Sequence, residues 1–311
     1  MKIALCIPAY NAEKYLPLLL TSAQKQTIPF YEILVYDDCS TDRTAEIAAK
    51  FGATVIKGTI NKGCSFGKNT LAEVAQSDWL HFHDADDDLL PDFTKKVTSW
   101  IENQEVTFEV LLLNFEYVDY QTKKLLGKGN YNVTALHQDP VKYTIENRVV
   151  NFGVYQRKSF LMAGGFDNNV NILYNEDNAF HQKLARYGYH FDYLPEITCI
   201  NYRYTESMSA SNQLKCAHAN FYVLKEASDK VGKNYPQEIA HQLWNCMTIL
   251  GSFQDWEYVK KCIQLLKNLN RKTPSDQNKI FSLIAAVSPF YAIWIREKLI
   301  RLFKPNLRVH A

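Results

Sequence analysis

The chain has 311 residues, of which 47% are hydrophobic and 22% charged, with a net charge of +2 at pH 7. This composition is typical of a globular protein with a large core, and it argues against extensive disorder. A charge so near zero leaves no basic footprint for nucleic acid, which we therefore do not expect as a partner. The seven cysteines form no Cys-x-x-Cys pair, which argues against a disulfide framework and a structural zinc site.

The first hundred residues alternate between strand and helix patterns. The N-terminal apolar run is too short for a signal peptide, and with the cysteine usage it predicts a cytoplasmic protein that starts on a strand. Asn11 is expected to cap the first helix and Gly52 to end the second. Apolar strands separated by helices predict an α/β fold with a mostly parallel, Rossmann-like sheet covered on both faces. Strands are expected at 2–7, 33–36, 54–56 and 79–83, and helices at 11–26, 41–51 and 65–76.

The pattern changes after residue 110. Residues 110–117 and a hairpin through Gly127 and Gly129 predict further strands. Residues 177–187 predict a helix closed by Gly188, and residues 190–203 predict two short strands around Pro195. From about residue 216 the pattern is helical. We therefore expect one domain over 1–215, with halves 1–109 and 110–215, and a helical C-terminal region over 216–311.

Polar side chains follow each of the first four expected strands. They are Tyr10 and Asn11 after the first, Asp37, Asp38 and Ser40 after the second, Asn61 and Gly63 after the third, and an acidic run after the fourth. The carboxyl ends of parallel strands share one edge of a sheet, where ligands of such sheets bind. Four strand ends therefore predict one binding site.

The acidic run places five carboxylates within nine residues, at positions 84, 86, 87, 88 and 92. Such side chains repel one another unless a cation lies among them, and Mg²⁺ or Mn²⁺ with oxygen ligands is the natural candidate. The alternative is a solvated acidic turn before a helix that begins near Pro91, and Asp87 and Asp88 fit that alternative best. His81 and His83 flank the run and are expected to be packed rather than to bind metal.

Nine segments in order give the chain a resemblance to glycosyltransferase family 2, which has a GT-A fold. They are residues 7–11, 35–42, 61–63, 67–69, 84–86, 164–167, 175–177, 202–203 and 207–209. The resemblance covers about the first 210 residues. It implies a GT-A type nucleotide-binding sheet, with a nucleotide-binding half over 1–109, an acceptor-binding half over 110–215 and a C-terminal helical extension.

The resemblance implies that Asp38 accepts the imide N–H of a uracil, although an Asx-turn that caps the next helix would also explain the residue. Tyr10 is suited to lie against the base, beside Pro8. Asn61 and Gly63 are expected where backbone approaches the nucleotide. Lys68 stands where the family commonly has arginine, so its contact with the nucleotide and a solvated helix face both stay open.

The resemblance assigns the metal to Asp86 and the ribose or sugar to Asp84. Asp177 is expected to be the base that takes the proton of the acceptor hydroxyl in an inverting transfer. The alternative for residues 176–177 is a charge at a helix start. Glu176 is expected to orient groups on the acceptor side. Arg203 and Ser207 are expected in a loop over the diphosphate, where no histidine offers a third metal ligand.

An apolar segment at 280–295 falls short of the ~20 residues that span a bilayer. Five basic residues follow it, at positions 296, 298, 301, 304 and 308. Two interpretations stay open: peripheral membrane contact through residues 280–308, or a helix packed on the protein.

We therefore hypothesise a metal-dependent inverting glycosyltransferase. It would move a hexose or N-acetylhexosamine from a nucleotide sugar, chiefly a UDP-sugar, to a glycan or lipid-linked glycan in bacterial surface polysaccharide synthesis. Its place would be the cytoplasm, including the inner face of the plasma membrane. One rival is a sugar-phosphate nucleotidyltransferase, which would need a Gly-rich loop where residues 8–11 read Pro-Ala-Tyr-Asn. The other is a catalytically silent nucleotide- or glycan-binding module, for which a base at Asp177 would have no use.

Overall fold

The computed structural model describes residues 1–104, 107–204, 211–271 and 279–308. The chain divides into two compact units. The first comprises residues 1–141, 149–168 and 176–207, and the second comprises residues 142–148, 169–175 and 208–311.

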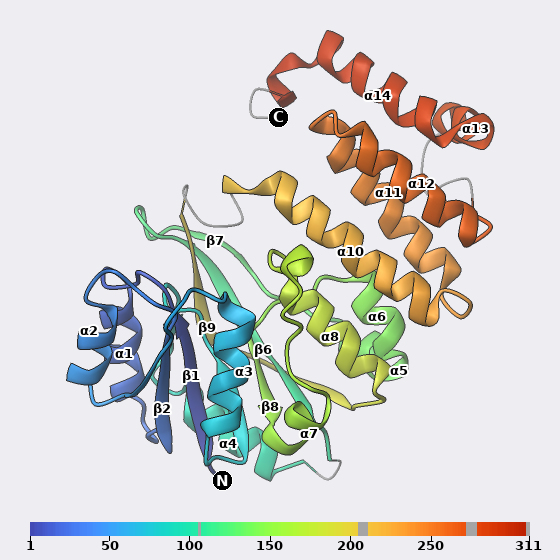
Figure 1. The fold of residues 1–311 in the computed structure, drawn as a ribbon. Coiled ribbons are helices and arrows are strands. Elements are labelled where there is room, and N and C mark those ends of the chain that lie inside the picture. The colour runs from blue at the N-terminus through green and yellow to red at the C-terminus, as the bar shows by residue number, and fades with distance from the viewer. Residues whose placement is uncertain (105–106, 205–210, 272–278, 309–311) are drawn as a thin grey trace. The chain divides into compact units, whose positions relative to one another are not determined.

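One nine-stranded sheet forms the centre of the first unit, in the order β3-β2-β1-β4-β8-β6-β9-β5 with β7 paired to β6 (Figure 1). Its strands are β1 (Ile3–Ala9), β2 (Glu32–Asp37), β3 (Thr54–Lys57), β4 (Trp79–Phe82), β5 (Asp88–Leu89), β6 (Val110–Asp119), β7 (Leu125–Lys128), β8 (Gly153–Gln156) and β9 (Phe191–Arg203). The predicted α/β fold is confirmed. Strands β1 to β4 are parallel to one another, as expected, whereas β5, β7 and β8 pair antiparallel with their neighbours.

The prediction of two short strands at 190–203 was wrong, because β9 is continuous through Pro195. The register against β6 jumps from Leu113↔Leu194 to Asn114↔Ile197, so residues 195 and 196 are looped out as a bulge. Proline has no N–H to give to the ladder, and a bulge is where a strand accepts it. The Asn114 side chain donates to the freed carbonyl of Pro195 at 2.7 Å.

Helices surround this sheet: α1 (Leu16–Gln24), α2 (Thr44–Lys50), α3 (Cys64–Val74), α4 (Phe93–Glu102), α5 (Val133–Gln138), α7 (Arg157–Met162) and α8 (Glu176–Arg186), with α6 (Pro140–Glu146) at the division between the units. Helix α3 packs against β1 and β2 (Figure 1). Their approach is close because Gly67 in α3 has no side chain. A Cβ there would lie 2.8 Å from the ring of Tyr36 and 3.3 Å from Pro8. Asn11 was predicted to cap α1, which is wrong, since α1 begins at Leu16 and no side chain caps it.

An aromatic cluster ties the end of β4 to α8. Phe166 stacks on Phe180 with 4.1 Å between ring centroids, and Phe82 lies edge-on to Phe166 at 5.5 Å. Phe160 contacts both Phe82 and Phe180. All four rings are fully or almost fully buried. Aromatic rings packed at this density resist displacement, so the residues that follow Phe82 and those that precede Phe180 are held at fixed positions.

The second unit is helical, which confirms the predicted C-terminal extension (Figure 1). It contains α10 (Gln213–Val231), α11 (Pro236–Ser252), α12 (Trp256–Asn268), α13 (Lys279–Val287) and α14 (Pro289–Phe303), with short 3₁₀ turns η1 (Val170–Ile172) and η2 (Pro305–Arg308). The apolar segment 280–295 is split between α13 and α14, because Ser288 is an N-cap whose hydroxyl accepts from Tyr291 and Pro289 occupies the first helical turn. Within the described ranges, the chain has no helix with the length and apolarity to cross a membrane.

Candidate active site

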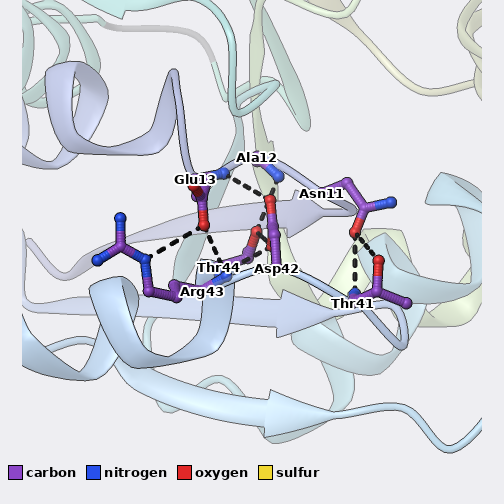
Figure 2. Close-up of polar contacts among 7 residues, drawn as sticks. All are labelled: Asn11, Ala12, Glu13, Thr41, Asp42, Arg43 and Thr44. Carbon is purple, nitrogen blue, oxygen red and sulfur yellow. Dashed lines mark hydrogen bonds and ion pairs between the residues drawn. The ribbon is translucent and has the colours of Figure 1, made fainter.

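The loops that leave β1 and β2 are bound to each other by side chains (Figure 2). Asn11 accepts from the backbone N–H of Thr41 at 2.9 Å, and Asp42 accepts from the backbone N–H of Glu13 at 3.1 Å. The Thr44 hydroxyl accepts from the backbone N–H of Ala12 and donates to Asp42. Asn11 adopts a positive φ of 48°, which asparagine tolerates well. These bonds make two strand ends into one rigid rim.

Asp42 is the acceptor that joins this rim most extensively. Its carboxylate receives the hydroxyl and backbone N–H of Thr44 as well as the N–H of Glu13. Burial acts to raise the pKa of Asp42, but the Thr44 hydroxyl and the backbone donors outweigh it and lower the pKa below its usual value. The charged form is therefore the one that holds the loops together.

Asp38 holds the loop after β3. Its carboxylate is buried and accepts the backbone N–H groups of Lys62 at 2.8 Å and Gly63 at 2.7 Å. Gly63 has a φ of 85° as it enters α3, a conformation that glycine adopts without strain. Asp38 thus does not cap the next helix, and its expected contact with a base stays a prediction. Tyr10 is 52% exposed, Asn61 is exposed and Pro8 is half-buried on the same rim.

Lys68 joins the two acidic motifs. Its side chain is 1% exposed, and its Nζ lies 3.1 Å from Glu176 and 3.8 Å from Asp84. Burial acts to lower the pKa of Lys68, but the carboxylates of Glu176 and Asp84 outweigh it and raise the pKa, so the side chain is a cation. The alternative of a solvated helix face is therefore wrong. A single buried charge brings residues 84–86 and 176–177 to one place.

Two further side chains near Lys68 were missed. Burial and the nearby Glu176 raise the pKa of the Cys64 thiol, whose S–H donates to Glu176 at 3.4 Å. Asn69 donates to the carbonyl of Phe166 and accepts from its N–H, both at 2.8 Å. A Cβ on Gly165 would lie 2.2 Å from the Asn69 side chain, so Gly165 allows this pairing. The motif 67–69 was visible in the sequence, but its partner lies almost a hundred residues later.

The acidic run pairs with β9 through β5 before it reaches α4, where Asp92 occupies the N-cap position without a side-chain hydrogen bond. Asp87 is buried and accepts from Asn201 at 2.7 Å and from the backbone N–H of Tyr202 at 2.9 Å, while Asp88 lies in β5. The helix-start interpretation of Asp87 and Asp88 is therefore wrong. Burial, followed by the charges of Asp86 and Asp84, raises the pKa of Asp87.

Asp84 and Asp86 offer oxygen ligands at the mouth of β4. The side chain of Asp84 is 48% exposed, so it is open to solvent on the side away from Lys68. Burial, and then the neighbouring charge of Asp84, raises the pKa of Asp86 to about 6. A carboxylate destabilised in this way by burial and a like charge gains from a divalent cation, so the residues fit Mn²⁺ or Mg²⁺. The backbone carbonyl of Asp86 also accepts from the Tyr204 hydroxyl at 2.9 Å, a contact that the sequence did not predict.

His81 and His83 are fully buried behind this mouth, as expected. Nδ1 of His81 lies 2.9 Å from the carbonyl of Gly153, which can only accept, so His81 carries its proton there. Its Nε2 therefore accepts from Nδ1 of His83 at 2.9 Å. Burial lowers the pKa of His81 to about 4 and also lowers that of His83, so the pair is neutral. Together with Cys199 it is the one group of three potential metal ligands found among the described residues.

Glu176 and Asp177 are the first two residues of α8. Asp177 is 8% exposed and its Oδ1 accepts the N–H of Asn178 at 2.8 Å. The carbonyl of Asp177 accepts from Nδ1 of His181 at 2.7 Å, and Nε2 of His181 in turn accepts from the Tyr155 hydroxyl at 2.9 Å. These two hydrogen bonds fix the start of α8 to β8. Both carboxylates lie at the N-terminal end of α8, where a negative charge stabilises a helix. The expectation of a charge at a helix start therefore holds whether or not Asp177 is a base.

Arg203 is the last residue of β9 and not part of a loop, and its guanidinium lies 4.2 Å from the ring centroid of Tyr117. It is exposed. Ser207 lies outside the described residues, as do all residues from 205 to 210.

Comparison with known proteins agrees with this arrangement. The model of a family described as glycosyl transferase family 2 matches residues 4–161, which is half of the chain. The chain belongs to glycosyltransferase family 2. A protein of Haemophilus influenzae named an uncharacterized glycosyltransferase is 24% identical to it over 95% of this chain and 99% of its own length.

Other proteins similar to this glycosyltransferase include TarS and a mannosyltransferase. TarS of Staphylococcus aureus is named a poly(ribitol-phosphate) β-N-acetylglucosaminyltransferase. It is 26% identical over an alignment that covers 61% of this chain and 37% of TarS. The structure of TarS residues 1–349 with UDP-GlcNAc has a TM-score of 0.63 at 17% identity and covers 97% of this chain and 92% of that one. A mannosyltransferase of Pyrobaculum calidifontis with GDP-Man and Mn²⁺ has a TM-score of 0.60 at 16% identity, covering 98% and 81%. These structures confirm the GT-A fold.

The rim between β1 and β2 predicts an acid-dependent stability. Asp42→Asn should lower the free energy of unfolding by about 1 kcal/mol at pH 7, because an amide cannot accept from every donor that Asp42 serves. The folded pKa of Asp42 is lowered, so this stabilisation is present above the unfolded pKa of about 4 and lost as the pH falls through the folded value. Urea unfolding at several pH values should show the difference shrinking below about pH 4. A difference independent of pH would contradict the assignment, and the exposed Asp229→Asn is the control.

The charge of Lys68 predicts a large loss of stability on its removal. Lys68→Met should lower the free energy of unfolding by about 3 kcal/mol, since Glu176 is left buried without its cation. The double variant with Glu176→Gln should recover part of that loss, and urea unfolding of all four proteins measures the coupling. Lys96→Met, which removes a partly exposed ion pair with Asp92, should cost less than about 1 kcal/mol. Equal costs for the two lysines would disprove the buried bridge.

Proposed function

We propose that this glycosyltransferase moves a hexose or N-acetylhexosamine from a UDP-sugar to a hydroxyl of a glycan or lipid-linked glycan, with inversion and with a divalent metal. The observation that carries the proposal is the buried Lys68 cation, which contacts Asp84 and Glu176 together. An inverting transfer needs the leaving nucleotide and the base on opposite faces of one sugar. Lys68 contacts both Asp84 and Glu176, and this contact supports a single site that uses residues 84–86 and 176–177.

The uridine preference rests on Asp38 and on the relatives. A carboxylate has about four lone-pair sites, and the N–H groups of Lys62 and Gly63 engage one on each oxygen. Asp38 thus has room to accept the imide N–H of uracil, with Tyr10 exposed beside it for stacking. Two relatives from Escherichia coli are named as UDP-Glc-dependent glucosyltransferases, and a solved TarS structure holds UDP-GlcNAc.

Asp86 is the proposed metal ligand, with Asp84 on the ribose or sugar. Mn²⁺ or Mg²⁺ bound there would neutralise the charge that develops on the leaving diphosphate. Lys68 contributes by holding Asp84 in place, and Tyr204 by holding the backbone of Asp86. Lys68 is therefore a positioning residue in this proposal, while Arg203 and Ser207 stay proposed contacts of the diphosphate.

Asp177 is the proposed base. Its backbone is pinned through His181 to Tyr155, and its Oδ1 accepts the N–H of Asn178, so the carboxylate has a defined direction at the start of α8. In that position it would accept the proton of the acceptor hydroxyl. Glu176, held by Lys68 and Cys64, orients that end of the helix.

The proposed acceptor follows from the named relatives. One from E. coli is named for transfer to α-D-GlcNAc-diphosphoundecaprenol, and TarS for transfer to poly(ribitol-phosphate). We infer a role in bacterial surface polysaccharide synthesis at the inner face of the plasma membrane, where the donor and a lipid-linked acceptor meet. Membership of the family argues against a nucleotidyltransferase. A catalytically silent module would give no metal-dependent hydrolysis of the donor.

The metal site predicts that nucleotide binding depends on Asp86. With Mn²⁺ present, UDP should raise the melting temperature of the wild-type protein, and Asp86→Ala should abolish that shift because the bridging charge is lost. Asp92→Ala, a carboxylate of the same run that pairs with Lys96, should keep the shift. A panel of nucleoside diphosphate sugars with and without Mn²⁺ identifies the donor. A full shift in Asp86→Ala would move the metal site elsewhere.

The base predicts a separation of binding from turnover. Asp177→Asn should keep the affinity for UDP while reducing sugar transfer by about 10²- to 10⁴-fold, since the amide cannot accept the proton. Isothermal titration with UDP and a transfer assay measure the two effects. The control is Asp78→Asn, an exposed residue beside the N-terminal end of β4. Unchanged turnover in Asp177→Asn would remove Asp177 from the mechanism.

A further inference from the structure

The last two helices expose an unusual share of large apolar side chains. Of the 23 such side chains that are exposed in the described parts of the chain, nine lie between residues 280 and 307. They are Ile280, Leu283, Val287, Tyr291, Trp294, Leu299, Leu302, Phe303 and Leu307. Single exposed apolar residues are ordinary, but a group this dense marks a surface that is covered in the working protein.

These side chains form stripes. In α13 the exposed Ile280, Leu283 and Val287 follow the i, i+3, i+7 spacing of one helix face. In α14, Tyr291, Trp294 and Leu302 follow the i, i+3, i+11 spacing of one face, with Lys298 between them.

The opposite face of α14 is already occupied. Ala292 and Ile293 are buried, and a Cβ on Gly251 in α11 would lie 2.7 Å from the Ile293 side chain. Arg301 donates to the carbonyl of Ser252 at 2.6 Å. The helix is thus fixed to the bundle by its inner face, and its apolar outer face needs a different partner.

The charge of this segment selects that partner. Residues 279–308 contain six lysines and arginines and one carboxylate, a net charge of +5, whereas the whole chain carries +2. The one carboxylate, Glu297, is 2% exposed and pairs with Arg301 and Arg308 inside the fold. Lys279, Lys298 and Lys304 are exposed. A second copy of the same surface would be repelled, while an anionic bilayer would be attracted.

We propose that α13 and α14 form a docking surface that lies in the interface of an anionic lipid bilayer. Neither helix has the length to cross the bilayer, so both would rest on it. Tyr291 and Trp294 are side chains typical of that interface, and Lys298, with its Nζ 5.6 Å from the ring of Trp294, can extend toward lipid phosphates. The proposal rests on the proposed function only for its purpose, which is to bring the enzyme to a lipid-linked acceptor.

Cosedimentation of the full chain with vesicles tests the surface. Wild-type protein should bind vesicles of phosphatidylcholine with 30% phosphatidylglycerol at least about tenfold more tightly than pure phosphatidylcholine, and less tightly in 0.5 M salt. Leu302→Gln with Phe303→Gln should weaken binding at least about tenfold, because two exposed anchors are lost. Lys298→Glu with Lys304→Glu should abolish the preference for anionic lipid. Met162→Gln with Val170→Gln, similarly exposed elsewhere, is the matched control and should bind as wild type.

The outcomes separate this inference from the proposed function. Equal vesicle binding by wild type and both surface variants would overturn the docking surface, as would no binding by the wild type. The wild-type protein could instead bind no vesicles and form a dimer in analytical ultracentrifugation that Leu302→Gln with Phe303→Gln converts to a monomer. That result would assign the surface to a second copy of the chain. The Mn²⁺-dependent UDP melting shift, measured on the same proteins, tests the donor site alone. If the wild-type protein binds vesicles but shows no melting shift with UDP and Mn²⁺, the proposed function would be contradicted and the docking surface would not.

Discussion

The structure of the candidate site depends on one buried cation. An ammonium group taken out of water is costly unless carboxylates accompany it, and Lys68 satisfies that requirement with Glu176 and Asp84. The requirement acts in both directions, because the carboxylate of Glu176 is itself largely buried and needs the lysine. Three elements, α3, the mouth of β4 and the start of α8, are thereby brought together by charge. The mechanism that we propose for sugar transfer uses the same three places.

Apolar packing supplies the rigidity that this charge cluster needs. Phe82, Phe166 and Phe180 connect β4 to α8, and Nζ of Lys68 lies 4.9 Å from the ring centroid of Phe166. Asn69 binds the backbone of Phe166 to α3. The loops above are fixed independently, through Asp42 at the first two strand ends and Asp38 at the third. Aromatic packing and carboxylates that bind backbone N–H groups thus both restrain the candidate site.

The C-terminal helices differ from the first unit, because they leave many large apolar side chains exposed. Their inner faces are satisfied by the bundle, through contacts such as Ile293 with Gly251, yet their outer faces remain apolar and flanked by lysines. The only carboxylate of the segment, Glu297, pairs with Arg301 and Arg308 inside the fold. The exposed charges of the segment are therefore all basic. If this face only had to be soluble, polar residues would be expected on it.

Local patterns were sufficient for the elements and for the family. Alternating apolar runs predicted the first four strands, and short motifs in order predicted the GT-A fold, since strand ends and turns depend on neighbouring residues. Two failures were local, the cap at Asn11 and the strand break expected at Pro195, and the others were contacts over long separations. Asp87 and Asp88 were assigned to a helix start, but Asp87 binds β9 more than a hundred residues later. A solvated helix face was an open alternative for Lys68, but the residue is buried against Glu176, 108 residues away, while its contact with the nucleotide stays a prediction. The sequence by itself thus determined which residues carry charge at the strand ends. Only the tertiary structure decided which charges are buried against one another, because burial and pairing depend on chain segments that local pattern cannot relate.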